Sequence, residues 1–332
     1  MVPSKRVVAA VLGLALLAGG LAAAPGATAT DPTTIMFGAY PRYRGTETKR
    51  QAVLNLEKAI GRPLAAVRVF KLWDHSFPDG YDTWLRDSGH MLFLSVKTKR
   101  TNGTYVSWRG IADAQPGSTL YSQIASWADR VKAFGAPMVF IFNHEPEAKS
   151  SRGSGNNVDY IDAWRKVVTV FGDRGVTNAK FVWTMTDYSF WVQDQRSAPL
   201  WYPGDEWVDG IAADAYNWYE CRVTIKNRWK TLEEIVAPML AFGAAHPDEQ
   251  LMLTEWASSE DPAAAGRKAG WIQDVQALFQ QPGWDRFTAV LYFHTQDGYY
   301  TNCRWWVDTS SSSLTAFKTM ATDPYYAATT LP

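Results

Sequence analysis

Two glutamates follow short apolar runs, each at the point where a buried strand would end. Glu145 comes after the run 137–143, and Glu255 comes after the run 251–254. In a parallel barrel, a side chain at the C-terminal end of a strand points into the mouth where such folds carry out chemistry. Two carboxyl groups in that mouth can serve as proton donor and nucleophile, which is the chemistry that cleaves a glycosidic bond.

The surroundings of the two glutamates predict different roles. Glu145 is predicted to be the acid, because a partly desolvated strand end lined by aromatic residues can raise its pKa. Glu147 fits a solvated loop position better, since Pro146 turns the chain away from the strand. Glu255 is predicted to be the nucleophile, because the seventh strand lies nearly opposite the fourth in a barrel of eight. For each residue, the alternative is an ordinary loop glutamate. That alternative explains one such glutamate better than it explains a pair at matching positions.

No metal or cofactor is expected at this pair. The His144-Glu145 dipeptide lacks the HExxH spacing that places two histidines on one helix face for zinc, and the chain has only five histidines. Double displacement by two carboxyl groups needs no cofactor.

The elements that would position these residues alternate between strand and helix. Near-continuous apolar runs are typical of parallel strands buried on both faces, whereas apolar residues spaced at helical intervals fill the segments between them. The pattern predicts a single (β/α)₈ TIM barrel with long loops at its C-terminal face and some degenerate helices. The predicted strands cover 35–39, 66–72, 91–96, 138–142, 181–185, 208–213, 251–254 and 287–293. The predicted helices cover 46–60, 120–134, 158–171, 232–242, 263–279 and 314–320, with a short helix near 81–85 and an aromatic loop without a helix over 188–205.

Residues 1–29 have the composition of a secretory signal peptide. Lys5 and Arg6 are basic, an apolar stretch covers 7–24, and small residues at 27–29 fit a cleavage site. No later apolar run approaches the roughly 20 residues that a membrane helix needs. We therefore expect residues 30–332 to form one catalytic domain, secreted to the extracellular space and without membrane contact.

The charges of the chain balance, with 33 basic and 33 acidic residues among 332. This balance lacks the basic excess typical of proteins that bind nucleic acid or an anionic membrane, and it fits an uncharged ligand better. The 16 tryptophans, 15 tyrosines and 15 phenylalanines exceed what core packing usually requires. Aromatic rings stack on sugar rings, although a large aromatic core would explain the same composition. We expect a polysaccharide substrate and a monomeric protein.

Cys221 and Cys303 are the two cysteines of the chain. An even count in an oxidising compartment predicts that they form a disulfide. Both follow predicted strand ends, so the bridge would join two loops on the same face of the barrel.

These residues together resemble glycoside hydrolase family 26. The resemblance extends from the first predicted strand to the eighth. Its most specific parts are the Tyr-Pro-Gly-Asp segment before the sixth strand and the order of the two glutamates. The matching segments are His144-Glu145, Tyr160, Ala163-Trp164-Arg165, Phe181-Val182-Trp183, 201–210, Asp214-Ala215-Tyr216 and Thr254-Glu255.

The resemblance implies a retaining glycosidase with the acid/base at Glu145 and the nucleophile at Glu255. It further implies that Tyr216 hydrogen-bonds the nucleophile and that His144 lines the subsite of the sugar being cleaved. Members are mostly endo-β-1,4-mannanases, and some act on β-1,3-1,4-glucan or β-1,3-xylan. Family mannanases continue the acid/base motif with Met-Asn-Gly and a tryptophan cluster, whereas a polar, Gly-rich loop follows 146–151 here. We therefore predict an endo-β-glycanase with β-1,4-mannan as the leading substrate.

Further side chains on the predicted strands and in the loops after them are candidates for sugar contacts or for support of the acids. Arg68 is a candidate cation beside the nucleophile, or else a member of a structural ion pair, and Asp214 is a candidate support on the sixth strand. A non-catalytic polysaccharide-binding barrel remains the alternative from another functional class. The residues predicted to bind substrate are Trp73, Trp183, Trp191, Trp218, His294, Trp305 and Trp306.

Overall fold

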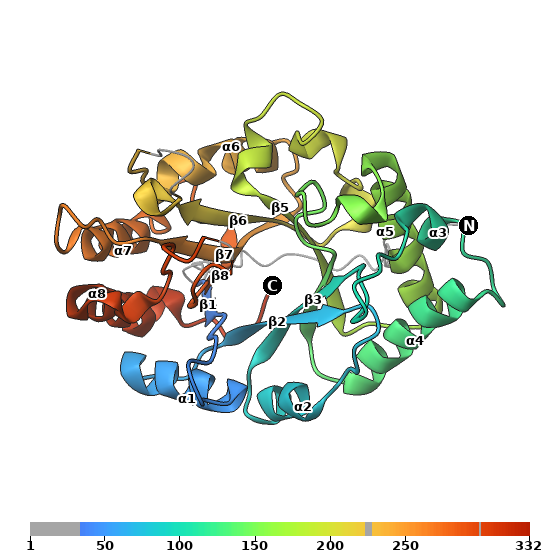
Figure 1. Cartoon of the computed structure of the whole chain (residues 1–332), viewed down its shortest axis with the longest axis horizontal. Helices are drawn as coiled ribbons and strands as arrows, with labels where there is room; N and C mark the ends of the chain where they lie inside the picture. The colour runs from blue at the N-terminus through green and yellow to red at the C-terminus, as the bar shows by residue number, and fades with distance from the viewer. Residues whose placement is uncertain (1–33, 223–227, 299) are drawn as a thin grey trace, which may run out of the picture. The chain divides into compact units, whose positions relative to one another are not determined.

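Eight parallel strands close into a barrel in the order in which they occur in the chain. The computed structural model describes residues 34–332 except 223–227 and 299, so the predicted signal peptide lies outside the described residues. Figure 1 shows the strands at the centre of the fold with helices around them. The predicted TIM barrel is confirmed. The strands are β1 (Met36–Ala39), β2 (Ala66–Leu72), β3 (Met91–Lys97), β4 (Met138–Phe142), β5 (Ala179–Thr186), β6 (Gly210–Asn217), β7 (Gln250–Ser258) and β8 (Phe287–Tyr292).

The helices follow the predicted pattern, with one addition. Helix α3 was not predicted, because its five residues are too few to show a helical period. The aromatic loop between β5 and β6 contains three short 3₁₀ turns and no α-helix. The helices are α1 (Lys49–Ile60), α2 (Gly80–Asp87), α3 (Trp108–Ala112), α4 (Thr119–Phe134), α5 (Asn157–Asp173), α6 (Leu232–Ala244), α7 (Arg267–Leu278) and α8 (Ser311–Thr322). None of the helices in the described ranges is long and apolar enough to cross a membrane.

Local capping signals explain where several helices begin. The Thr48 side chain accepts a hydrogen bond from the backbone of Gln51, and the Gln51 side chain accepts one from the backbone of Thr48. The same reciprocal arrangement joins Thr231 and Glu234 at the start of α6. Such capping boxes satisfy backbone donors that the first helical turn leaves unpaired.

Inside the barrel, an apolar layer gives way to a polar layer toward the C-terminal ends of the strands. The apolar layer contains Phe93, Val139, Val182 and other buried residues of one compact cluster. Side chains two positions further along a strand face the same side. On several strands, the next inward-facing position after the apolar layer has a polar or ionisable side chain. These residues include Arg68, Ser95, Thr184 and Asp214, all of them buried.

Candidate active site

Glu145 follows β4 on a backbone that adopts an unusual conformation. The φ angles of Asn143 and Glu145 are 47° and 49°, in the left-handed region that residues with a Cβ rarely occupy. Hydrogen bonds to both neighbouring strands hold this backbone, from the Asn143 amide to the Val96 carbonyl (2.9 Å) and from the Glu145 amide to the Thr184 carbonyl (3.0 Å). Strained backbone of this kind persists where surrounding structure determines it, and it clusters at functional sites.

The side chain of Asn143 links this turn to the adjacent loops. Its Oδ1 accepts hydrogen bonds from the backbone amide (3.0 Å) and the hydroxyl (2.7 Å) of Thr98. Its Nδ2 donates to Ser151 Oγ (3.1 Å), and that hydroxyl donates to the carbonyl of Glu145 (3.0 Å). The position of the Glu145 carboxyl group therefore depends on a buried polar network that spans β3 and the loop after β4.

A β-bulge on β7 directs Glu255 into the barrel. Ala213 pairs with Leu253 and Asp214 pairs with Glu255, so that Thr254 is the extra residue on β7. Both Thr254 and Glu255 make contacts on the inner side, whereas Trp256 packs against Trp271 in the helix layer. Without the extra residue, the alternation along the strand would turn Glu255 outward.

Two side chains orient the Glu255 carboxylate. The Tyr216 hydroxyl donates a hydrogen bond to Oε2, and Arg68 Nη2 lies 3.5 Å from Oε1. All three side chains are buried. Burial raises the pKa of Glu255, and the Arg68 charge and the Tyr216 hydrogen bond oppose that rise. The two neighbours therefore favour an ionised and oriented carboxylate, as a nucleophile requires.

Glu145 has the opposite electrostatic character. Burial and, second, the negative charge of Glu255 raise the pKa of Glu145 to about 8. Lys97 and Arg68 counteract this rise only in part. Surroundings that push the pKa of one carboxyl group up while a cation and a hydrogen bond oppose that rise for its partner separate an acid from a nucleophile.

His144 is held as a neutral imidazole. Ser95 Oγ lies 2.8 Å from its Nδ1, and the Phe70 ring packs against it with ring centroids 5.2 Å apart. Burial, together with the charges of Arg68 and Lys97, lowers the pKa of His144 well below 6.5. A neutral ring in this position can exchange hydrogen bonds with a sugar hydroxyl.

Glu147 is buried, so the expectation of a solvated loop acid was wrong. One of its carboxyl oxygens, Oε1, accepts hydrogen bonds from the backbone amide (2.9 Å) and hydroxyl (2.6 Å) of Thr186 and from Ser189 Oγ (2.7 Å). The Pro146 turn places Glu147 against the end of β5 and not in solvent. Burial raises the pKa of Glu147 despite these bonds.

Asp214 supports the inner face of β7. Thr254 Oγ1 donates a hydrogen bond of 2.7 Å to Asp214 Oδ1. Burial and the charge of Glu255 raise the pKa of Asp214 well above 3.8. Burial therefore favours the neutral form of Asp214, which weakens the negative charge beneath the glutamate pair.

A cleft of about 610 Å³ opens over these residues. Glu145, Asp214 and Tyr216 lie in its wall together with Trp191 and Trp218. The volume and the aromatic lining are typical of a site that binds a small molecule or part of a polymer. Trp191 is 49% exposed, so its ring is free to stack on a sugar.

Trp73, Trp183 and Trp305 do not fit their predicted role as sugar platforms, because their side chains are buried. Trp73 donates its indole hydrogen to Gln123 (2.7 Å), and Trp183 packs among Phe190, Tyr202 and Phe242 in the layer between barrel and helices. Trp305 lies behind the cleft wall, against the rings of Tyr216 (5.0 Å) and Trp218 (5.1 Å). Position after a strand end did not distinguish these rings from the exposed ones.

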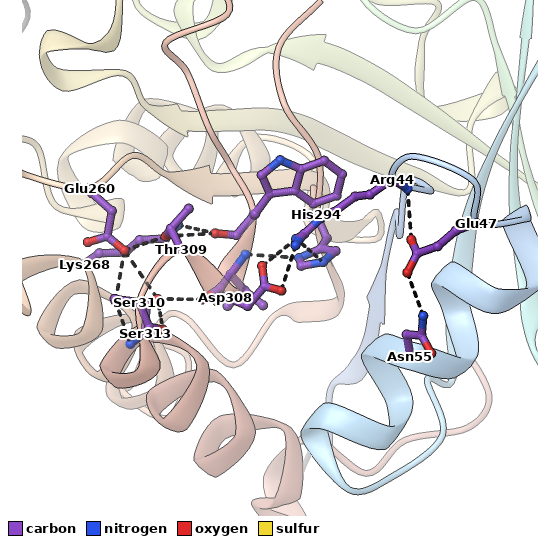
Figure 2. A network of polar contacts seen from close by, with 12 residues as sticks. Arg44, Glu47, Asn55, Glu260, Lys268, His294, Asp308, Thr309, Ser310 and Ser313 are labelled. Atoms are coloured by element: carbon purple, nitrogen blue, oxygen red, sulfur yellow. Dashed lines mark hydrogen bonds and ion pairs between the residues drawn. The ribbon is translucent and has the colours of Figure 1, made fainter.

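Trp306 and His294 are also buried and belong to a structural network beside α8. His294 Nδ1 accepts from the backbone amide of Val307 (3.1 Å), and its Nε2 lies 3.2 Å from Arg44 Nη2. The Arg44 guanidinium stacks on Trp306 (3.8 Å) and pairs with Asp308, as Figure 2 shows. Burial lowers the pKa of His294 to about 3. These two residues therefore join the β1–α1 and β8–α8 loops and do not line the cleft.

The predicted disulfide between Cys221 and Cys303 is present. It joins the segments that follow β6 and β8, near Trp218 and Trp305. The bridge therefore stabilises the wall of the cleft that contains Trp218.

Sequence reasoning missed Lys97 and Ser95 on β3. Lys97 Nζ donates to Ser150 Oγ (3.0 Å), and its charge acts on both catalytic candidates. The alternation Phe93, Ser95, Lys97 was the available signal, since it places both residues on the face of an inward phenylalanine. Among the described residues, no group of three or more His, Cys, Asp or Glu side chains is arranged to hold a metal ion.

We expect Glu145→Gln to stabilise the folded chain above pH 8. The pKa of Glu145 is about 8 in the fold against an ordinary 4.5, so the folded state loses stability as pH rises between these values. Glutamine removes that loss. Because the side chain keeps some solvent contact, we expect a gain of about 1–2 kcal/mol in the free energy of unfolding. Denaturant titrations should show this gain above pH 8 and none below pH 4.5. Glu233→Gln, at an exposed position on α6, is the control and should change stability little at either pH. Equal stabilisation by both variants would contradict the argument.

Comparison with known proteins identifies a matching family. The model of glycosyl hydrolase family 26 matches residues 113–245, which include β4, the Glu145 turn and β6. Endoglucanase H of Acetivibrio thermocellus is 26% identical over 285 residues. That match covers 82% of this chain, which spans only 29% of the length of the endoglucanase.

Solved structures share the fold. A β-mannanase of the same family from Bacteroides ovatus superposes with a TM-score of 0.60 at 18% identity, covering 88% of this chain and 90% of that one. The catalytic domain of an endo-β-1,4-mannanase from a Bacillus species gives a TM-score of 0.61 at 16% identity, covering 89% and 87%. At this identity the likeness concerns the fold. Together with the family match, it bears out the resemblance to family 26.

Proposed function

We propose that this glycosidase, with its match to glycosyl hydrolase family 26, cleaves internal bonds of a β-linked polysaccharide by double displacement. The observation that carries the proposal is the pair of unlike glutamates. Burial and the charge of Glu255 raise the pKa of Glu145 to about 8, whereas the Arg68 charge and the Tyr216 hydrogen bond orient Glu255 and oppose the rise of its pKa that burial causes. A protonated acid beside an ionised nucleophile is what the retaining mechanism requires.

In the first step, a carboxylate oxygen of Glu255 attacks the anomeric carbon and forms an ester with the sugar. The bond from that carbon to the departing oxygen breaks as Glu145 donates its proton to that oxygen. In the second step, Glu145 removes a proton from water, and the water oxygen attacks the anomeric carbon. The ester bond breaks, the Glu255 carboxylate is restored, and the product keeps the β configuration of the substrate.

Neighbouring side chains have supporting roles in this proposal. Tyr216 and Arg68 orient Glu255 and balance its charge. His144 offers a neutral ring beside the sugar that is cleaved, and Trp191 and Trp218 offer aromatic faces in the cleft. Asp214 is a positioning residue that acts through Thr254.

The leading backbone is β-1,4-mannan, because the two structural relatives described above are a β-mannanase and an endo-β-1,4-mannanase. A β-1,3-1,4-glucan or a β-1,3-xylan is the alternative within the same chemistry. We further propose that the chain acts outside the cell after removal of residues 1–29, on the strength of the signal-like sequence there.

A non-catalytic binding barrel is the alternative of a different class. Loss of catalysis in such a barrel would relieve the selection that keeps two buried carboxyl groups together, since burying ionisable groups destabilises a fold. Both glutamates are present, and Tyr216 and Arg68 contact Glu255 as the proposed reaction requires.

The direct test is product analysis on soluble β-mannan, β-1,3-1,4-glucan and β-1,3-xylan. We expect new reducing ends on at least one polymer, with a rapid fall in viscosity because cleavage is internal. Proton NMR of the first products should show the β anomer before it equilibrates. First products with the α anomer would exclude double displacement, and the absence of new reducing ends on any β-glycan would exclude the hydrolase assignment.

A further inference from the structure

The cleft over the two glutamates is rich in basic side chains, although the chain as a whole carries no net charge. The basic residues come from three loops at the C-terminal face of the barrel. One set follows β4, one follows β5 and one follows β6. They are Lys149, Arg152, Arg196, Arg222, Arg228 and Lys230. A neutral sugar polymer does not require such an accumulation of positive charge.

Two of the six basic residues are neutralised by acids outside the cleft lining. Arg196 pairs with Asp194, and Arg228 pairs with Glu234. Within the described part of the chain, Lys149, Arg152, Arg222 and Lys230 form no salt bridge. Lys149 and Arg152 are exposed on the loop after Glu145, and the Arg152 charge acts on Asp194 without a direct ion pair.

The acidic residues of the same cleft do not offset these charges fully. The four carboxyl groups in its wall are Glu145, Glu147, Asp187 and Asp214. Burial raises the pKa of each, to about 8 for Glu145 and to about 7 for Asp187. At neutral pH the wall of the cleft is therefore more positive than the count of its side chains indicates.

Two of these four cations lie over aromatic rings of the cleft, and Arg222 also donates a hydrogen bond to the Tyr300 hydroxyl (3.1 Å). The Arg222 guanidinium lies 4.8 Å from the ring centre of Trp218, and Lys230 Nζ lies 5.9 Å from that of Trp191. A cation held against an aromatic ring of a sugar-binding cleft lies where an anionic substituent of a sugar packed among these rings meets its charge.

We propose that the polysaccharide cleaved here carries anionic groups, either carboxylates or sulfate esters, and that Lys149, Arg152, Arg222 and Lys230 bind them. This inference rests on the proposed function, since it specifies the substrate class of the same cleft. It revises the expectation of an uncharged ligand, which followed from the net charge of the whole chain. Lys149 and Arg152 lie directly after the Glu145 turn, so an anionic group that they bind lies close to the bond being cleaved.

The test compares neutral β-glycans with lightly substituted carboxymethyl and sulfate-ester derivatives of the same polymers. We expect the wild-type chain to show a higher kcat/KM on one anionic series than on its neutral parent, and the two series distinguish carboxylate from sulfate recognition. The advantage should shrink as salt is raised from about 0.01 M to about 1 M, because screening shortens the reach of the charges from about 30 Å to about 3 Å.

Variants locate the effect. The double variant Lys149→Gln with Arg152→Gln should lower the ratio of anionic to neutral kcat/KM by about 3- to 10-fold and flatten its salt dependence, given that each exposed charge pair contributes about 0.2–1 kcal/mol. Lys58→Gln, at an exposed lysine on α1 outside the cleft, is the matched control and should leave the ratio unchanged. Circular dichroism verifies that each variant is folded.

The outcomes separate this inference from the proposed function. Cleavage of neutral polymers with no advantage for either anionic series overturns the inference and leaves the hydrolase assignment intact. A ratio that the double variant and Lys58→Gln change equally also overturns it. Failure to cleave any polymer, neutral or anionic, removes the proposed function and this inference with it.

Discussion

Replacing Glu255 with glutamine is expected to lower kcat on every cleaved β-glycan by on the order of 10⁵-fold, in line with losses seen when a covalent nucleophile is removed. The glutamine amide has nearly the shape of the carboxylate but cannot form the sugar ester. It also leaves Arg68 without its negative partner. Initial rates from reducing-sugar release measure the loss, and thermal unfolding verifies that the variant is folded.

Glu233→Gln is the matched control, because it makes the same chemical change at an exposed glutamate on α6. It should retain wild-type rates. A further check uses Glu255→Ala with azide, which fills the space of the lost carboxylate and attacks in its place. The product should be an α-glycosyl azide, of inverted configuration. Strong hydrolysis by Glu255→Gln would remove the nucleophile assignment.

Replacing Glu145 with glutamine is expected to lower kcat/KM on polysaccharides by about 10²- to 10⁴-fold, the usual contribution of a general acid. A sugar leaving group needs the proton, whereas an aryl leaving group of low pKa departs without it. The loss in the first step should therefore be far smaller on aryl β-glycosides. Rates on both substrate types, measured in parallel, test the role of Glu145.

The pH dependence of the wild-type chain provides an independent check on Glu145. The acid must be protonated, and its pKa is about 8, so kcat/KM should fall as pH rises through about 8. Glu255 must be ionised, and its pKa is raised above 4.5, so activity should also fall on the acidic side at a pH above 4.5. The alkaline fall should be absent in Glu145→Gln. With azide, Glu145→Ala should yield a β-glycosyl azide, the opposite of the Glu255→Ala product. Identical azide products from the two alanine variants would contradict the separate roles.

The burial that makes Glu145 an acid also destabilises the fold. The same raised pKa that extends protonation to about pH 8 makes the native state less stable as pH rises toward that value. Activity and stability therefore respond in opposite directions to Glu145→Gln. A conflict between activity and stability is expected where catalysis depends on groups whose pKa values are shifted by burial.

Much of the fold follows from local properties of the sequence. Parallel strands buried on both faces need continuous apolar runs, and helices need caps such as Thr48 and Thr231, so both leave signals within a few residues. The position of Glu145 after a strand end follows in the same way, whereas the prediction for Glu255 was wrong, because β7 continues beyond it to Ser258. The disulfide also followed from a count, because two cysteines allow only one pairing.

The orientation of side chains depends on contacts between distant segments. The bulge at Thr254 becomes evident only when β7 is aligned with β6, and it decides that Glu255 faces inward. Glu147 is buried because the Pro146 turn brings it to Thr186, on the next strand. Trp183 and Trp191 are equally aromatic, yet one is enclosed by α6 and the other is open to the cleft.

The charged residues show most plainly which properties the sequence determines and which the tertiary structure determines. The sequence alone determined that basic and acidic residues balance over the whole chain. Only the tertiary structure brought Lys149, Arg152, Arg222 and Lys230 around one cleft and placed its carboxyl groups where burial raises their pKa values. Electrostatic effects depend on distance and on solvent exposure, and the folded chain sets both quantities.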